Sequence, residues 1–152
     1  MLTAWLDLQR ATLAMKCEGL TGEQLRAKAV PPSNLSLLGL VRHMAEVERN
    51  WFKPLLAGEQ MAGLWAARAE LDPEPAFEEA GTAEVPAAFA AWRAECEQAR
   101  KLVAAADLDV TGMRGGTRFS LRWVMVHMIE EYARHNGHAD LLRERIDGST
   151  GA

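Results

Sequence analysis

The chain has 152 residues, with 17 basic and 21 acidic side chains and a formal net charge of −4. This length fits one domain, residues 1–152, which can bury a core without disulfides. Hydrophobic residues make up 49% and charged residues 25%, a balance that excludes wholesale disorder and fibrous repeats. The acidic balance argues against a nucleic-acid partner, because such surfaces need clustered Lys and Arg.

The cysteines and the apolar stretches indicate the compartment. Cys17 and Cys96 lie far apart and in no Cys-x-x-Cys spacing, so neither a disulfide framework nor a cysteine zinc site is predicted. Charged residues interrupt every apolar stretch before the roughly 20 residues of a membrane span, and Asp7 interrupts the N-terminal stretch where a signal peptide needs an apolar core. We therefore expect a cytoplasmic protein with reduced thiols and no membrane contact.

Helical periodicity begins at the N-terminus. The first predicted helix runs from about Leu2 to Glu18, and its apolar positions include Trp5, Leu6, Leu8, Leu13 and Met15. Residues 21–34 contain two consecutive prolines and predict a loop. The second helix then runs to about Phe52, and its N-cap is offered by Ser33, Asn34 or Ser36.

The middle of the chain is rich in helix breakers. Residues 53–86 contain Pro and Gly throughout and predict a long connection, with one or two short helical turns around residues 63–70. Pro86 suits the first turn of a third helix, because its missing amide is not needed there. This helix runs toward Ala104.

The last third of the chain combines a turn-rich stretch with the longest periodic segment. Residues 107–120 contain three glycines and predict either a short hairpin or a plain loop. Ser120 offers an N-cap for a fourth helix, which runs to about Ile146 and ends at Gly148. Four long helices joined by loops predict an all-α fold, an antiparallel four-helix bundle.

Polar residues occupy the centre of the apolar face of the fourth predicted helix. At about 100° per residue, Glu131, His135 and His138 share this face with Val124 and Leu142. A carboxylate and imidazoles on a buried face are costly unless something pairs with them. This concentration predicts a functional site.

A divalent metal site is the leading interpretation. His43 lies on the apolar face of the second helix, while Glu131 and His135 are on adjacent turns and can reach one ion together. Two imidazoles and one carboxylate suit Zn²⁺, Ni²⁺ or Fe²⁺, and three protein ligands leave a coordination position open. His138 is either a fourth ligand or a group behind the ligands, and spacing does not decide between these roles.

A metal-free alternative stays open, in which these side chains form an internal hydrogen-bond network. His127 is predicted as a bystander or a pocket-wall residue, and Trp51 as a residue that lines a pocket. Gly39 and Gly137 either allow tight packing or make room for a ligand. The arginines near the start of the fourth helix either bind an anionic substrate or form a solvated face; they are Arg114, Arg118 and Arg122.

Two long stretches carry a family resemblance, VPPSNLSLLGLVRHMAEVERNWF and LRWVMVHMIEEYARHNGHADLLRERIDGSTG, and MKCEGLTGEQL extends it over nearly the whole chain. They closely resemble the mini-circle protein subfamily of the DinB/YfiT-like metalloenzymes. The resemblance implies a four-helix bundle in which a histidine from the second helix and an HxxxH pair from the fourth hold a divalent metal. His43 and His135 match this pattern, with Gly137 two residues after His135. Glu131 replaces the first histidine of the pair, as in the mycothiol-dependent maleylpyruvate isomerase branch.

The resemblance also implies a chemistry. Members with assigned activity are thiol-dependent transferases and isomerases that use bacillithiol or mycothiol. We therefore expect a divalent metal (Zn, Ni or Fe), mycothiol as co-substrate, a small-molecule substrate and a homodimer. The alternatives are a metal-dependent hydrolase, in which the ion activates water, and a non-catalytic helical module for ligand binding or protein interaction.

Overall fold

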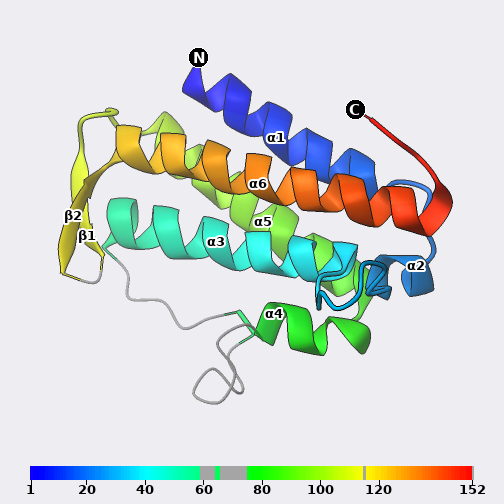
Figure 1. Cartoon of the computed structure of the whole chain (residues 1–152). Coiled ribbons are helices and arrows are strands. Elements are labelled where there is room, and N and C mark those ends of the chain that lie inside the picture. The colour runs from blue at the N-terminus through cyan, green and yellow to red at the C-terminus, as the bar shows by residue number, and fades with distance from the viewer. Residues whose placement is uncertain (59–63, 66–74, 115, 152) are drawn as a thin grey trace.

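The computed structural model describes residues 1–58, 64–65, 75–114 and 116–151. The chain is mostly helical, as predicted, with one small two-stranded sheet. Four long helices run alongside one another (Figure 1), with α1 packed on α6 and α3 packed on both α5 and α6. The elements are α1 (Leu2–Cys17), α2 (Gly22–Arg26), α3 (Leu37–Ala57), α4 (Pro75–Glu78), the 3₁₀ turn η2 (Glu79–Gly81), α5 (Val85–Ala104), β1 (Thr111–Arg114), β2 (Thr117–Ser120) and α6 (Leu121–Asp147).

Side-chain caps start the helices that carry the polar cluster. Ser36 Oγ accepts a hydrogen bond from the Gly39 amide at 3.1 Å, and Ser120 Oγ accepts one from the Trp123 amide at 3.2 Å. Each cap satisfies an amide that has no partner inside its helix. At the other end of α6, Gly148 adopts a left-handed conformation with φ 80°. These predicted boundaries are confirmed.

The short helix α2 lies where the sequence analysis predicted only a loop. Thr21 Oγ1 accepts from the Gln24 amide at 3.2 Å, and the Gln24 side chain accepts from the Thr21 amide at 2.9 Å. This reciprocal capping box satisfies two amides at the helix start. Leu25 is buried. The loop prediction is therefore wrong for residues 22–26, where the Thr-x-x-Gln spacing starts a helix.

Helix α3 continues past Phe52, beyond its predicted end. Pro54 lies inside the helix and removes one backbone hydrogen bond. Tertiary packing holds this last turn, because β1 crosses directly over it: a Cβ added to Gly112 would lie 2.6 Å from the Leu55 carbonyl oxygen. The helix ends at Gly58, whose φ of 67° is favourable for glycine.

The long predicted connection contains α4 and η2. Both lie after the predicted turns at residues 63–70, most of which fall outside the described residues. In the turn-rich stretch, the hairpin alternative is confirmed: β1 and β2 pair antiparallel, with Thr111 opposite Ser120 and Arg114 opposite Thr117.

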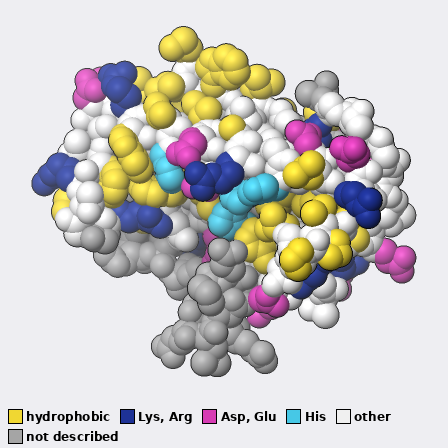
Figure 2. All heavy atoms as spheres, viewed as in Figure 1, with side chains coloured by type: hydrophobic (Ala, Val, Ile, Leu, Met, Phe, Trp, Pro, Cys, Tyr) yellow, Lys and Arg dark blue, Asp and Glu magenta, His cyan; other side chains and the backbone are white. Residues whose placement is uncertain are grey.

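The predicted apolar positions of the first helix do not all face the core. Leu6 and Leu13 are buried, whereas Trp5, Leu8 and Met15 are exposed. Hydrophobic side chains accordingly gather at the top of Figure 2, where Figure 1 draws α1. Within the described ranges, no helix combines the length and hydropathy that crossing a membrane requires.

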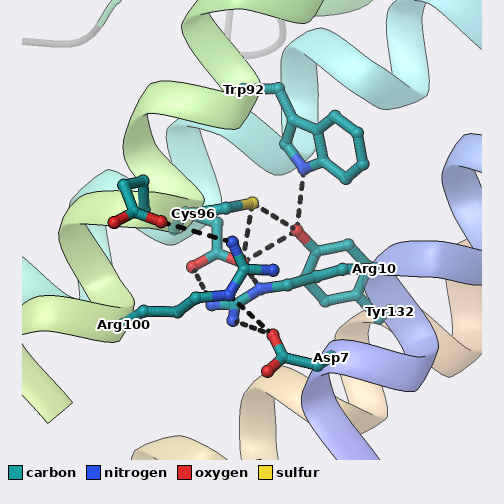
Figure 3. Close-up of polar contacts among 8 residues, drawn as sticks. Asp7, Arg10, Trp92, Cys96, Arg100 and Tyr132 are labelled. Atoms are coloured by element: carbon teal, nitrogen blue, oxygen red, sulfur yellow. Dashed lines mark hydrogen bonds and ion pairs between the residues drawn. The ribbon is translucent and has the colours of Figure 1, made fainter. Parts of the chain in front are cut away.

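One buried polar network joins all four long helices (Figure 3). Both carboxylate oxygens of Glu48, in α3, accept from Arg10 of α1 at 2.7 Å each. The Tyr132 hydroxyl of α6 donates to Glu48 at 2.8 Å and accepts from the Trp92 indole of α5 at 2.8 Å. The Cys96 thiol of α5 donates to Glu48 at a Sγ–Oε1 distance of 3.6 Å.

Burial makes this network sensitive to the loss of any member. The Glu48 side chain has no exposed surface and that of Arg10 is 4% exposed. A buried ion pair contributes little to the net free energy of folding, but removing one partner leaves an unpaired charge in the interior, which is strongly destabilising. Burial, and then the nearby Glu48 charge, raise the pKa of Tyr132 well above its usual value, so its hydroxyl stays protonated and can donate.

We expect Arg10→Met to lower the free energy of unfolding by about 3–5 kcal/mol, because it leaves the Glu48 carboxylate buried without its cation. Arg100→Met is the matched control: Arg10 and Arg100 both donate to Asp7 Oδ1, at 2.9 and 3.0 Å, but the Arg100 side chain is 41% exposed. Its loss should cost less than about 1 kcal/mol. Urea unfolding followed by circular dichroism measures both values. Equal losses in the two variants would contradict this account of the network.

Candidate metal centre

Three of the predicted site residues converge between α3 and α6. His43 from α3 and Glu131 and His135 from α6 each offer one ligand atom, and these atoms lie within 4.8 Å of one another. The His135 Nε2 to Glu131 Oε2 distance is 3.5 Å, and the His43 and His135 ring centroids are 4.6 Å apart. The two helices therefore bring together the residues that the sequence pattern singled out.

The donor set fits a divalent cation. Ligand atoms that each lie about 2.1 Å from a tetrahedral zinc ion are about 3.4 Å apart, close to the 3.5 Å between His135 Nε2 and Glu131 Oε2. Burial, followed by the neighbouring His43, His138 and Arg134, lowers the pKa of His135 to about 3. The ring is therefore neutral at pH 7, as a metal ligand must be.

His138 lies behind His135. Its Nδ1 is 3.3 Å from His135 Nδ1, whereas His135 Nε2 faces Glu131. The two nitrogens of the His135 ring thus have different neighbours. A hydrogen bond at one ring nitrogen fixes the tautomer and orientation of the ring and leaves the other nitrogen free to bind.

His127 lies on the other side of Glu131. Its Nε2 is 3.8 Å from Glu131 Oε1. The His127 ring stacks on Trp123, with centroids 4.9 Å apart and planes at 16°, and meets Trp51 edge-on at 4.6 Å. All four histidines of the chain therefore belong to one connected cluster.

Phe77 is a site residue that the sequence did not reveal. This buried ring, from α4, stacks on His43 with centroids 5.2 Å apart. It occupies space that Gly39 leaves, because a Cβ on Gly39 would lie 2.7 Å from Phe77 Cδ1. The tight-packing alternative for Gly39 is therefore confirmed. Gly137, by contrast, is exposed, and a Cβ there would meet nothing within 4 Å.

The three arginines considered as anion contacts differ in their partners. Arg118 donates to a threonine hydroxyl of β1 at 3.2 Å, and Arg122 pairs with an aspartate before the hairpin at 2.9 Å. The guanidinium of Arg114 lies over the Trp51 ring, 4.0 Å from its centroid. Of the three arginines, Arg114 is therefore the one that contacts Trp51, the ring that also packs against His127.

The cluster reaches the molecular surface. Figure 2 shows histidine side chains on the drawn face, beside acidic and basic side chains and among hydrophobic ones. His43, Glu131 and His135 are each partly buried. Each of the three side chains therefore keeps part of its surface exposed to solvent.

We expect His135 to make the metal-free protein less stable in acid. Its pKa is about 3 in the folded chain and 6.5 for the free side chain, so the unfolded chain takes up the proton first as the pH falls. The free energy of unfolding is unaffected by this group above pH 6.5 and then falls, by up to about 2 kcal/mol at pH 5. Urea unfolding with chelator present at pH 7 and pH 5 measures the change. His135→Gln should lose correspondingly less, and identical acid losses in both proteins would refute the expectation.

A known family matches nearly the whole chain. The sequence profile of the family described as mycothiol-S-transferase matches residues 1–148. Comparison with curated proteins gave no match. The matched family is DinB/YfiT-like, which confirms the resemblance seen in the two long stretches around His43 and His135. This chain belongs to the mycothiol-S-transferase family.

Proposed function

We propose that this protein is a metal-dependent S-transferase that joins a mycothiol-type thiol to a small electrophile. Family membership supports the mycothiol-related transferase activity. The observation that supports metal dependence is the convergence of His43, Glu131 and His135 within reach of one ion. In this proposal the four long helices form a DinB-type four-helix bundle, and the homodimer expected from the resemblance stays a prediction.

Three side chains hold the divalent cation, whether Zn, Ni or Fe. His43 and His135 contribute ring nitrogens and Glu131 contributes an oxygen, so at least one coordination position is left for a substrate atom. A divalent cation bound there would lower the pKa of a thiol and so supply a thiolate nucleophile at neutral pH. Because His135 is already neutral, no proton has to leave it before it binds.

Two further histidines flank these ligands. His138, 3.3 Å from His135 at Nδ1, keeps Nε2 of His135 turned toward the cation. His127 lies beside the Glu131 carboxylate, 3.8 Å from its Oε1. His138 is therefore a positioning residue in this proposal, and the alternative of a fourth ligand is not adopted.

The burial of the chain's own cysteines supports an external thiol. Cys17 and Cys96 are both buried. Burial raises the pKa of each thiol to about 12, with the Glu48 charge adding to the effect at Cys96. Thiols of this kind stay protonated at neutral pH and are poor nucleophiles. The reacting sulfur therefore has to come from a small molecule.

We expect His43→Ala and His135→Ala to lose the metal, because each removes a ligand from a set of three. Protein purified without a histidine tag should hold about one divalent ion per chain in the wild type and less than about a tenth of that in either variant. His138→Ala is the matched control, and it should retain the ion with affinity lowered about 10–100-fold. Elemental analysis after loading with Zn²⁺ and removal of the excess by gel filtration into metal-free buffer measures the content. Full metal content in His43→Ala would remove that residue from the ligand set.

We expect the metal-loaded protein to consume mycothiol and an electrophile together, at least about tenfold faster than the metal-free protein. A free thiol with a pKa of about 8.5 is only about 3% thiolate at pH 7, so lowering that pKa below 7 raises the reactive fraction more than tenfold. Mass spectrometry of the thioether product measures the rate. Metal-loaded protein that hydrolyses substrates and leaves every thiol unconsumed would favour the hydrolase instead.

A further inference from the structure

A cavity lies next to the candidate metal centre, between the chain that follows α2 and the C-terminal half of α6. Its volume is about 220 Å³. Four of its lining side chains are aliphatic and two are polar, and none of the six is Lys, Arg, Asp or Glu. The lining residues are Val30, Ser33, Leu35, His138, Leu141 and Leu142.

His138 connects this cavity to the centre. It forms one wall of the cavity, and its Nδ1 lies 3.3 Å from His135 Nδ1. Leu142 is buried, whereas Leu141 is 57% exposed. The cavity therefore has a buried aliphatic floor and an open rim. A group that occupies it lies one side chain away from a proposed metal ligand.

The size and lining of the cavity select the chemistry of its ligand. An engineered aliphatic cavity of about 150 Å³ binds benzene in another protein, so this cavity has room for a phenyl ring with a short substituent. None of the six described residues that line the cavity is cationic, so they offer no counterion to an anionic group. Ser33 and His138 are too few partners for the many hydroxyls of a sugar-like group, which would be costly to bury. An uncharged apolar group fits best.

We propose that this cavity binds the uncharged alkyl or aryl group of the electrophilic substrate. The identity of that substrate rests on the proposed function, whereas the affinity of the cavity for an apolar group does not. With an epoxide as electrophile, the thiol of the co-substrate loses its proton and the sulfur attacks a ring carbon. The C–S bond forms, the C–O bond to that carbon breaks, and the released oxygen takes up a proton.

Binding is tested first without any reaction. Benzyl alcohol is titrated into metal-free protein with labelled Leu and Val methyl groups and followed by NMR. We expect methyl shifts at the cavity and an affinity at least fivefold weaker in Leu141→Trp, whose larger ring fills the rim. Leu8→Trp is the matched control, because Leu8 also lies on a helix and is 53% exposed, against 57% for Leu141. It should bind the probe as the wild type does.

The binding results separate this proposal from the proposed function. Methyl shifts centred elsewhere, or equal affinity in the wild type and Leu141→Trp, would overturn the cavity assignment. Shifts confined to Val30, Leu35, Leu141 and Leu142 support it. If that same protein, loaded with metal, transfers no thiol, the affinity of the cavity for an apolar group stands and the proposed function fails.

Substrate preference provides a second readout in an active enzyme. With mycothiol as the thiol, we expect kcat/KM for 1,2-epoxy-6-phenylhexane, whose chain lets the phenyl ring reach past His138 and His135, to exceed that for propylene oxide at least tenfold in the wild type. Leu141→Trp should reduce this preference at least fivefold, mainly by raising KM for the phenyl substrate, and Leu8→Trp should keep it. An unchanged preference in Leu141→Trp would overturn the assignment.

Discussion

The buried pair of Arg10 and Glu48 constrains how the long helices lie against one another. A carboxylate with no exposed surface needs its cation and its hydrogen-bond donors at one place. Sliding any of the four helices by one turn, about 5.4 Å, would separate at least one member of the network. The same helices carry the candidate metal centre: Glu131 directly precedes Tyr132 in α6, and His43 lies five residues before Glu48 in α3. The network therefore fixes the same relative positions of α3 and α6 that bring His43, Glu131 and His135 together.

Helix α6 supplies both polar sites because consecutive residues point about 100° apart. Tyr132 points into the interior and is fully buried, whereas Glu131 is 20% exposed beside His135. The deeper network is saturated: the oxygens of Glu48 accept from Arg10 and Tyr132. The shallower cluster holds imidazole nitrogens and a carboxylate that are only partly buried. Depth therefore separates a network suited to stability from a cluster suited to binding.

The sequence predicts those features of the fold and the site that depend on the spacing of residues within one helix. Glu131 and His135 were found because an i, i+4 pair of polar residues on an apolar face is visible in one helix, and the caps at Ser36 and Ser120 are equally local. Phe77 was not found, because it reaches His43 only through the packing of a distant connection. The buried network has one local signal in the sequence: Arg10 lies in the 4-3-4 spacing of the buried positions 6, 10, 13 and 17. Its partner in α3 follows only from how the helices pack.

Glu131 changes the charge of the proposed centre. Where the resemblance leads us to expect a neutral histidine, this chain has a carboxylate. One carboxylate and one thiolate together balance a divalent cation, whereas three imidazoles and a thiolate would leave a net positive charge in a partly buried site, which is costly to desolvate. In a metal-loaded centre the Glu131 carboxylate would also weaken the attraction between the cation and the sulfur. Because the nucleophilicity of a thiolate falls as its pKa falls, a smaller lowering of the thiol pKa leaves a more reactive sulfur. Replacement of histidine by Glu131 is thus compatible with thiol transfer and suits it electrostatically.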